Sequence, residues 1–136
     1  MITTASAWPV RETIDRLEAA VAEAGLLVFA RIDHAANAVN AGMALRPTEL
    51  LIFGHPRGGT PLMQDRQTSG LDLPMKALAW QDSSGRTWLT RDDAEWLASR
   101  HDLGAESAAA VEAISAGMAR LVGAVVAREA DPNSPQ

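Results

Sequence analysis

The stretch KALAWQDSSGRTWLT, residues 76–90, decides the kind of sheet that this chain forms. Two short runs rich in apolar and β-branched residues, 76–80 and 86–90, flank the polar segment Asp82-Ser83-Ser84-Gly85. Such a pattern predicts a β-hairpin with a loop of about four or five residues. The sheet therefore contains at least one antiparallel pair of strands.

Two further strands are expected upstream of this hairpin. Residues 26–32 form an apolar run after Gly25 that is broken only by Arg31, and residues 49–53 form a second apolar run. Runs of this length predict core strands. Residues 1–7 predict either a short edge strand or a loose segment.

Helices are expected between and after the strands. Apolar residues recur at helical spacing at Val10, Ile14, Leu17 and Val21, after Pro9 and before Gly25. Asp33 is the expected N-cap of a short helix over residues 34–41, which Gly42 closes.

The second half of the chain predicts three more helices. Thr60 and Pro61 resemble the N-cap and first residue of a helix over residues 61–67. Thr90 with Asp93 resembles a capping box for a helix that ends near Gly104. A longer helix over about residues 107–128 has an apolar stripe at Val111, Ile114, Met118, Leu121 and Val125.

These elements predict one α+β domain. The expected fold is a single compact two-layer domain with an antiparallel or mixed sheet backed by helices, and the length of 136 residues fits one domain. The domain is expected over residues 1–130, with a core at 10–104 and an extra C-terminal helix at about 107–128. Residues 131–136 hold two prolines and are expected to be disordered.

Composition disfavours several classes of function. The net charge is −5 and the chain has no run of basic residues, which disfavours nucleic-acid binding. The longest stretch without Asp, Glu, Lys, Arg or His is residues 35–45, too short to cross a bilayer. The chain has no cysteine and no visible signal peptide. We therefore expect a cytoplasmic protein without a membrane partner.

The segment from Gly54 to Gly59 has the glycine spacing of a phosphate-binding P-loop. Thr60 and Pro61 stand where that motif needs Lys and Ser or Thr, so a nucleotide triphosphatase is rejected. Two interpretations are left. The start of the helix at Pro61, with Arg57, could hold a small anion, or the glycines serve only a tight turn.

The histidines offer candidate chemistry. His34 and His55 each follow a core strand, and both would emerge at one sheet edge if these strands were parallel neighbours. Asp33 and Asp72 could then complete a metal site, although a His after a strand is more often a hydrogen-bonded loop residue. No metal site or cofactor is assigned on this basis. His101 is expected to interact with a helix dipole.

Asp33-His34 also suggests acid–base chemistry, but no nucleophile lies in a recognisable motif. Lys76 is the only lysine and is expected either to pair with Asp72 or to be solvated. The residues Trp80, Trp88 and Trp96 are expected in a core or a subunit interface rather than in a base-stacking surface.

Several motifs in fixed order resemble the Domain of Unknown Function 302 family. The matching segments are 32–37, 45–56, 59–63 and 70–76, within a similarity that runs from about Thr13 to Leu103. The matching residues of interest are Asp33, His34, Pro47, Thr48, Gly54, Pro56, Asp72, Pro74 and Lys76. The family often has Asn at the position of His55.

The resemblance implies a compact α+β fold, a homodimer and no established activity. The leading hypothesis is therefore a domain that binds a small polar or anionic ligand at strand ends. Its candidate site residues are Asp33, His34, Thr48, His55, Arg57, Thr60, Asp72 and Lys76. One alternative is an enzyme with His34 as general base or metal ligand and Lys76 as its partner. A second alternative is a purely structural dimerisation module.

Overall fold

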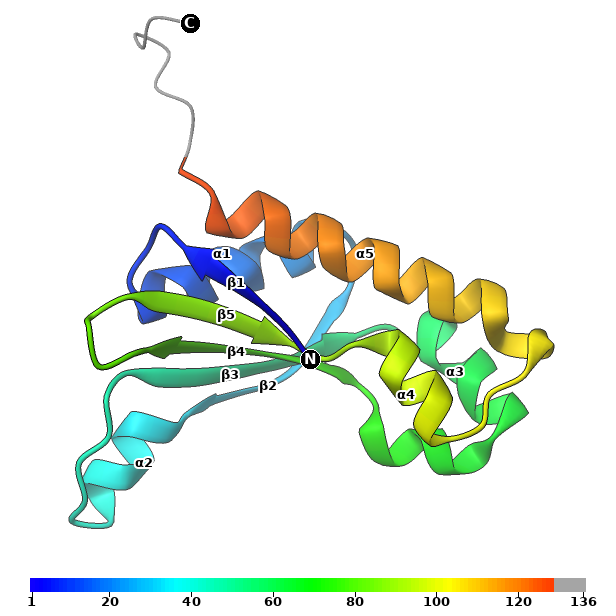
Figure 1. Cartoon of the computed structure of the whole chain (residues 1–136), viewed down its shortest axis with the longest axis horizontal. Helices are drawn as coiled ribbons and strands as arrows, with labels where there is room; N and C mark the ends of the chain where they lie inside the picture. Colours follow the sequence, from blue (N-terminus) through cyan, green and yellow to red (C-terminus); the bar gives the residue numbers. More distant parts are fainter. Residues whose placement is uncertain (129–136) are drawn as a thin grey trace, which may run out of the picture.

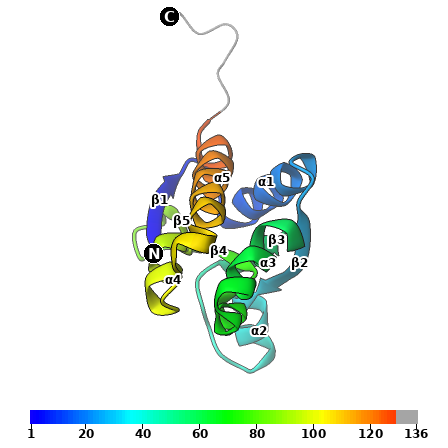
Figure 2. The same cartoon turned by 90° about the vertical axis from the view of Figure 1, so that its right-hand side faces the viewer.

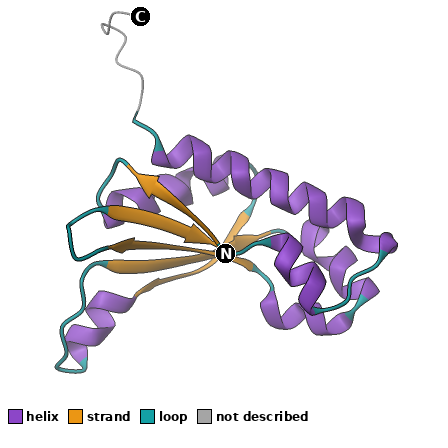
Figure 3. Cartoon of the chain, in the orientation of Figure 1, coloured by secondary structure: helices purple, strands orange, loops and turns teal. Residues whose placement is uncertain are grey.

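The computed structural model describes residues 1–128 and shows an α+β domain (Figures 1 and 3). The strands are β1 (Ile2–Ser6), β2 (Leu27–Asp33), β3 (Thr48–Gly54), β4 (Met75–Gln81) and β5 (Thr87–Arg91). The helices are α1 (Val10–Glu23), α2 (His34–Asn40), α3 (Pro56–Asp65), α4 (Ala94–Arg100) and α5 (Ala108–Val126). Two short 3₁₀ helices, η1 (Gln67–Asp72) and η2 (Ala105–Ser107), precede β4 and α5.

The five strands form one antiparallel sheet in the order β1-β5-β4-β3-β2. The hairpin predicted from residues 76–90 is confirmed as β4 and β5, which pair Trp80 with Trp88 across it. Residues 1–7 contain the edge strand β1. Figure 2 shows α1 and α5 on one side of the sheet and α2 on the other.

Helix α1 packs against the sheet through the stripe that the sequence predicted. Ile14, Leu17 and Val21 are completely buried, and Val10 is nearly so. Gly25 ends this segment with a φ of 76°, a left-handed conformation that glycine adopts without strain. Burying such a stripe is the main source of stability for a helix of this length.

Helix α5 closes the core over the same face of the sheet. Val111, Met118 and Val125 are buried as expected, whereas Ile114 and Leu121 are only partly buried. The stretch Ala105–Val126 is long and apolar enough by composition to cross a membrane, with a mean hydropathy of 1.6. Core helices of soluble proteins that are mostly buried pass the same test; 28% of the apolar window of this stretch is buried, and α5 supplies several core residues.

Helix α3 begins earlier than predicted. The prediction of Thr60 as N-cap is wrong because the His55 ring caps the helix, accepting the N–H of Arg57 at 3.1 Å, and Pro56 occupies its first turn. Pro61 consequently lies inside the helix.

The capping box predicted for α4 is also wrong in its residues. Asp93 itself caps α4, accepting the N–H of Glu95 at 3.0 Å. Thr90 stays in β5 and accepts a hydrogen bond from the indole of Trp80. The predicted disordered tail, 131–136, lies outside the described residues.

Asp65 links the end of α3 to the start of α5. Its Oδ2 accepts the hydroxyl of Ser107 at 2.7 Å and the N–H of Gly104 at 2.8 Å. These two hydrogen bonds hold the pKa of Asp65 below its ordinary value, and the bond from Ser107 has the larger effect.

We predict that Asp65→Asn lowers the melting temperature and flattens its pH dependence. A carboxyl whose pKa is lower in the folded chain stabilises that chain above its unfolded pKa of about 4, and this contribution is lost as the pH falls through the folded pKa. Thermal melts between about pH 3 and 7 would show a difference in melting temperature between the wild type and Asp65→Asn that becomes smaller as the pH falls. Asp102→Asn is the control, because that side chain is 95% exposed. A constant gap at all pH values would contradict the prediction.

Candidate functional site

The antiparallel sheet divides the predicted site residues between its two ends. Because β2 and β3 are antiparallel, the segments that follow them leave the sheet at opposite ends. Asp33, His34 and Thr48 therefore lie at the end that carries the β4–β5 turn. His55, Arg57, Thr60, Asp72 and Lys76 lie at the end near α3 and α4.

The strand register shows how far apart the two groups are. Asp33 pairs with Glu49, whereas Lys76 pairs with Ile52, three residues further along β3. That offset is about 10 Å along the strand, and β3 itself separates β2 from β4. Because β2 and β3 are antiparallel, the condition under which His34 and His55 would share a sheet edge is not met. The structure does not bring Asp33, His34 and Thr48 together with Thr60, Asp72 and Lys76 in one pocket.

Asp72 and Lys76 have separate partners. Asp72 contacts the Nε2 of His101 and lies 2.9 Å from the Nη1 of Arg100. His101 also lies 3.2 Å from the hydroxyl of Thr68, so its role is to join η1 to the end of α4, beyond a helix-dipole contact.

Lys76 does not pair with Asp72. Its Nζ lies 3.4 Å from Oδ2 of Asp92, and the same oxygen accepts the backbone N–H of Lys76 at 3.0 Å. The lysine therefore has a local structural partner at the end of β5.

The glycine segment is not a phosphate-binding loop. Gly58 and Gly59 lie within α3, and the His55 ring already occupies the N–H of Arg57 at its start. The anion site at the start of a helix at Pro61, one of the two interpretations, does not fit, because Pro61 lies inside α3 and not at its start. Within residues 1–128, no three His, Asp or Glu side chains are placed to hold a metal ion together.

A cleft of about 920 Å³ lies at the end of the sheet that carries the β4–β5 turn. We call it the end cleft. The start of α1, helix α2, the start of β3 and the hairpin turn surround it, and Figure 1 shows these segments together on the left. The side chains used below are Arg11, Asp33, Thr48, Glu49, Arg86 and Trp88, all of which line it.

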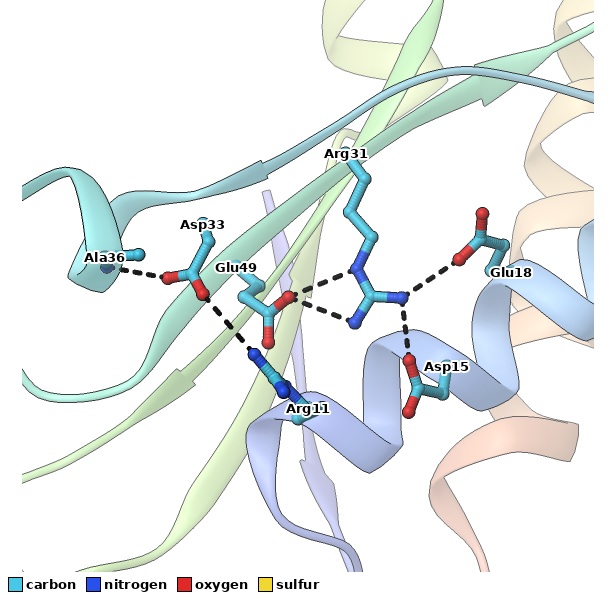
Figure 4. A network of polar contacts seen from close by, with 7 residues as sticks. All are labelled: Arg11, Asp15, Glu18, Arg31, Asp33, Ala36 and Glu49. Atoms are coloured by element: carbon cyan, nitrogen blue, oxygen red, sulfur yellow. Dashed lines mark hydrogen bonds and ion pairs between the residues drawn. The ribbon is translucent and has the colours of Figure 1, made fainter.

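Charged side chains around Arg31 link α1, β2 and β3 close to the end cleft (Figure 4). Arg31 lies 2.7 Å from Asp15 and 2.9 Å from Glu18, both on α1, and donates two bonds of 3.0 and 3.1 Å to Oε1 of Glu49. Although partial burial works against the charge, these three carboxylates hold the pKa of Arg31 above its ordinary value. Arg31 thus ties β2 to both α1 and β3.

Glu49 is buried, and it is one of the residues that line the cleft. Its side chain is only 8% exposed, and both bonds from Arg31 go to Oε1. Figure 4 shows the second oxygen turned away from Arg31, on the side of Arg11. In the described part of the chain, the buried side-chain polar atoms without a partner are hydroxyls of Ser69 and Ser115. Oε2 of Glu49 is not among them, and Glu49 lines the cleft.

Arg11 brings positive charge to the same place. It is 77% exposed and lies 3.9 Å from Oδ2 of Asp33, a long ion pair that leaves its donors largely available. Asp33 caps α2 as predicted, accepting the N–H of Ala36 at 2.9 Å. The start of α1, where Arg11 lies, has no side-chain cap and adds a favourable field for an anion. The cleft can thus offer donors from Arg11 and an acceptor from Glu49.

Sequence reasoning found part of this site and missed the rest. Asp33 and Thr48 were named and line the cleft, whereas Arg11, Glu49 and Arg31 were not named as site residues. A signal existed for two of them, because Arg31 interrupts the apolar run at 26–32 and Glu49 begins the apolar run at 49–53. A buried charge needs an oppositely charged partner, so an arginine and a glutamate in neighbouring apolar strands are expected to pair with each other.

We predict a marked non-additivity between Arg31 and Glu49. Arg31→Met should cost about 2–3 kcal/mol of unfolding free energy because it leaves Glu49 buried without its cation. The double variant Arg31→Met with Glu49→Leu should recover much of that loss. Urea unfolding of the four proteins measures this cycle, with the exposed Arg66→Met as control. Simple addition of the two single effects would refute a direct coupling.

The family model and the structure comparison point to one family. The family model described as "Domain of unknown function DUF302" matches residues 2–121. The crystal structure of an uncharacterized conserved protein DUF302 from Bacillus stearothermophilus is 20% identical, with a TM-score of 0.72 over 92% of this chain and 94% of that one. This likeness shows the fold alone.

Longer relatives carry a different name. Fluoride-specific ion channel FluC 1 of Brucella suis is 52% identical over 117 residues, which are 86% of this chain and 46% of that protein. FluC 1 of Brucella abortus matches with the same identity, over 43% of its length. The chain thus spans less than half of these relatives.

Proposed function

The chain belongs to the DUF302 family, and on that premise we propose that it binds a small anionic molecule in the end cleft. The observation that carries the proposal is that a buried carboxylate, Glu49, and an exposed guanidinium, Arg11, both line this cleft. The volume of about 920 Å³ is within the range of small-molecule sites.

The two charges select the ligand class. Arg11 would take a carboxylate or phosphate, since a guanidinium donates to either in a fork. Glu49 Oε2 would accept a hydroxyl or ammonium group of the same molecule. Trp88 supplies apolar surface at the rim. Hydroxy acids, amino acids and phosphorylated alcohols meet all three requirements.

The alternative of an enzyme that uses His34 together with Lys76 does not fit the geometry. It needs His34 and Lys76 to act together, but these residues lie at opposite ends of the sheet and Lys76 pairs with Asp92. Binding needs neither residue, so it is the reading that this site supports.

We predict that lactate or alanine raises the melting temperature more than propionate, which lacks the second polar group. Arg11→Ala should weaken binding roughly tenfold or more, as expected for a lost charged hydrogen bond. Glu49→Gln should weaken the binding of alanine and leave the binding of propionate nearly unchanged. Thermal-shift and calorimetric titrations measure both effects.

Arg57→Ala is the matched control, because Arg57 is an exposed arginine on α3 at the other end of the sheet. An equal loss in Arg11→Ala and Arg57→Ala would point to nonspecific charge effects. The absence of any shift with hydroxy acids, amino acids and phosphate at about 100 times a millimolar dissociation constant would refute the site.

A second candidate function comes from the Brucella relatives. A segment 52% identical to this chain makes up 43–46% of proteins named for a fluoride channel. We infer that this domain serves as an accessory to such a channel, with the pore supplied by other sequence. Its α+β sheet differs from the helices and closed barrels that cross membranes.

We predict that deleting the gene for this chain lowers the fluoride tolerance of its host. Growth curves across a fluoride series measure the inhibitory concentration, and a plasmid copy should restore it. A chloride series at equal ionic strength is the control. Unchanged fluoride tolerance after deletion would exclude the accessory role.

A further inference from the structure

The turn between β4 and β5 brings a second arginine to the wall of the end cleft. Arg86 stands directly before β5 and lines the cleft, as Arg11 does from the start of α1. Its side chain is exposed, and within residues 1–128 its guanidinium makes no hydrogen bond or ion pair. Arg46 differs, because it donates to the carbonyl of Gln81 at 3.0 Å and does not line the cleft. The guanidinium of Arg86 is thus available to a ligand.

The turn that carries Arg86 is held in place by Asp82. Oδ1 of Asp82 accepts the N–H of Ser84 at 2.9 Å and the N–H of Arg86 at 3.0 Å, and Oδ2 accepts the indole N–H of Trp88 at 2.9 Å. These bonds hold the pKa of Asp82 below its ordinary value, and the bond from Trp88 has the largest effect. The carboxylate is therefore engaged by N–H groups of the turn. The backbone of Arg86 is fixed while its side chain stays free to bind.

The two arginines reach the cleft from different sides of the sheet. Arg86 precedes β5, whereas Arg11 lies 3.9 Å from Asp33, the last residue of β2. Strands β4 and β3 lie between, so β5 and β2 are three strand spacings apart, which is about 14 Å. Long arginine side chains shorten this gap, yet a ligand that contacts both guanidinium groups must be elongated. The cleft volume of about 920 Å³ leaves room for such a molecule.

The other residues of the cleft suit an apolar body rather than a further cation. Glu49 already accepts two bonds from Arg31, and Asp33 caps α2 by accepting the N–H of Ala36. The indole N–H of Trp88 is used within the turn, so its ring offers apolar surface. Apolar side chains also line the cleft, namely Val39, Leu45 and Pro47.

We propose that the ligand of the end cleft carries two anionic groups joined by an apolar chain, with Arg11 binding one and Arg86 the other. This inference rests on the proposed function, in which Arg11 binds an anion and Glu49 accepts an ammonium or hydroxyl group of the same molecule. It narrows the ligand class to α-amino or α-hydroxy acids with a second carboxylate or phosphate at the far end. A guanidinium donates to either group in a fork.

The net charge of the chain makes this preference a demanding one. At −5, the field of the whole chain works against a ligand with an extra negative charge. Tighter binding of the more negative molecule therefore requires a local contact with a cation.

Calorimetric titration of the full chain with matched amino acids tests the proposal. α-Aminoadipate and α-aminosuberate end in a second carboxylate, whereas norleucine and α-aminooctanoate have the same carbon chains and end in a methyl group. The better-fitting diacid should bind about tenfold more tightly than its methyl-ended counterpart, the effect of one hydrogen bond between charged groups. Arg86→Ala should remove this preference and leave the binding of norleucine and α-aminooctanoate unchanged. Arg11→Ala should weaken the binding of all four.

Arg46→Ala is the matched control, because Arg46 is an exposed arginine at the same end of the sheet that does not line the cleft. It should keep the preference for the diacid. An equal loss in Arg46→Ala and Arg86→Ala would indicate a general field effect and overturn the contact with Arg86. A preference that survives in Arg86→Ala would overturn it as well. Circular dichroism and thermal melts show which variants are folded, and Arg86→Gln replaces Arg86→Ala if the latter fails to fold.

Failure of this inference is distinguishable from failure of the proposed function. If the methyl-ended amino acids bind as tightly as the diacids and Arg11→Ala weakens both, the cleft takes a ligand with one anionic group, and only the inference about Arg86 is overturned. If none of the four compounds binds, the ligand site itself is refuted.

Discussion

A single guanidinium in an edge strand fixes the relation between the sheet and its first helix. Arg31 on β2 holds Glu49 on β3 and two carboxylates on α1, so it joins three elements. Glu49 could not be buried without a cation beside it. The helix is thereby held in a position that brings Arg11 next to Asp33. The contacts of Arg31 and the buried stripe of α1 together place this helix at the side of the end cleft.

Local sequence patterns were enough for most of the fold. The stripe of α1, the hairpin, the cap at Asp33 and the stripe of α5 each depend on neighbours in the chain, and the structure confirms them. The direction of β3 relative to β2 could not be deduced in this way. The connection between them contains one short helix, and residue patterns within the strands are similar in both directions. The start of α3 was also predicted too late, because the glycines after His55 are typical of a loop and not of a helix.

The candidate site depended on the part of the fold that was hardest to predict. Residues with versatile chemistry, such as His55, Asp72 and Lys76, drew attention, but each has a local structural partner. Arg31 and Glu49 looked like interruptions of apolar strands. Their partnership depends on the strand register, which places them as diagonal neighbours on the α1 face of the sheet. The family resemblance supplied the fold and left the ligand open.

The sheet has its first strand at one edge, paired with its last. Ile2 of β1 lies opposite Arg91 of β5, and the N–H of Ala7, just after β1, donates to Val126 at the end of α5. During synthesis, β1 therefore leaves the ribosome long before its partner strand exists. Closing a loop of this length has an entropic cost and slows folding. The sheet can therefore take up its first strand only after the β5 hairpin has emerged.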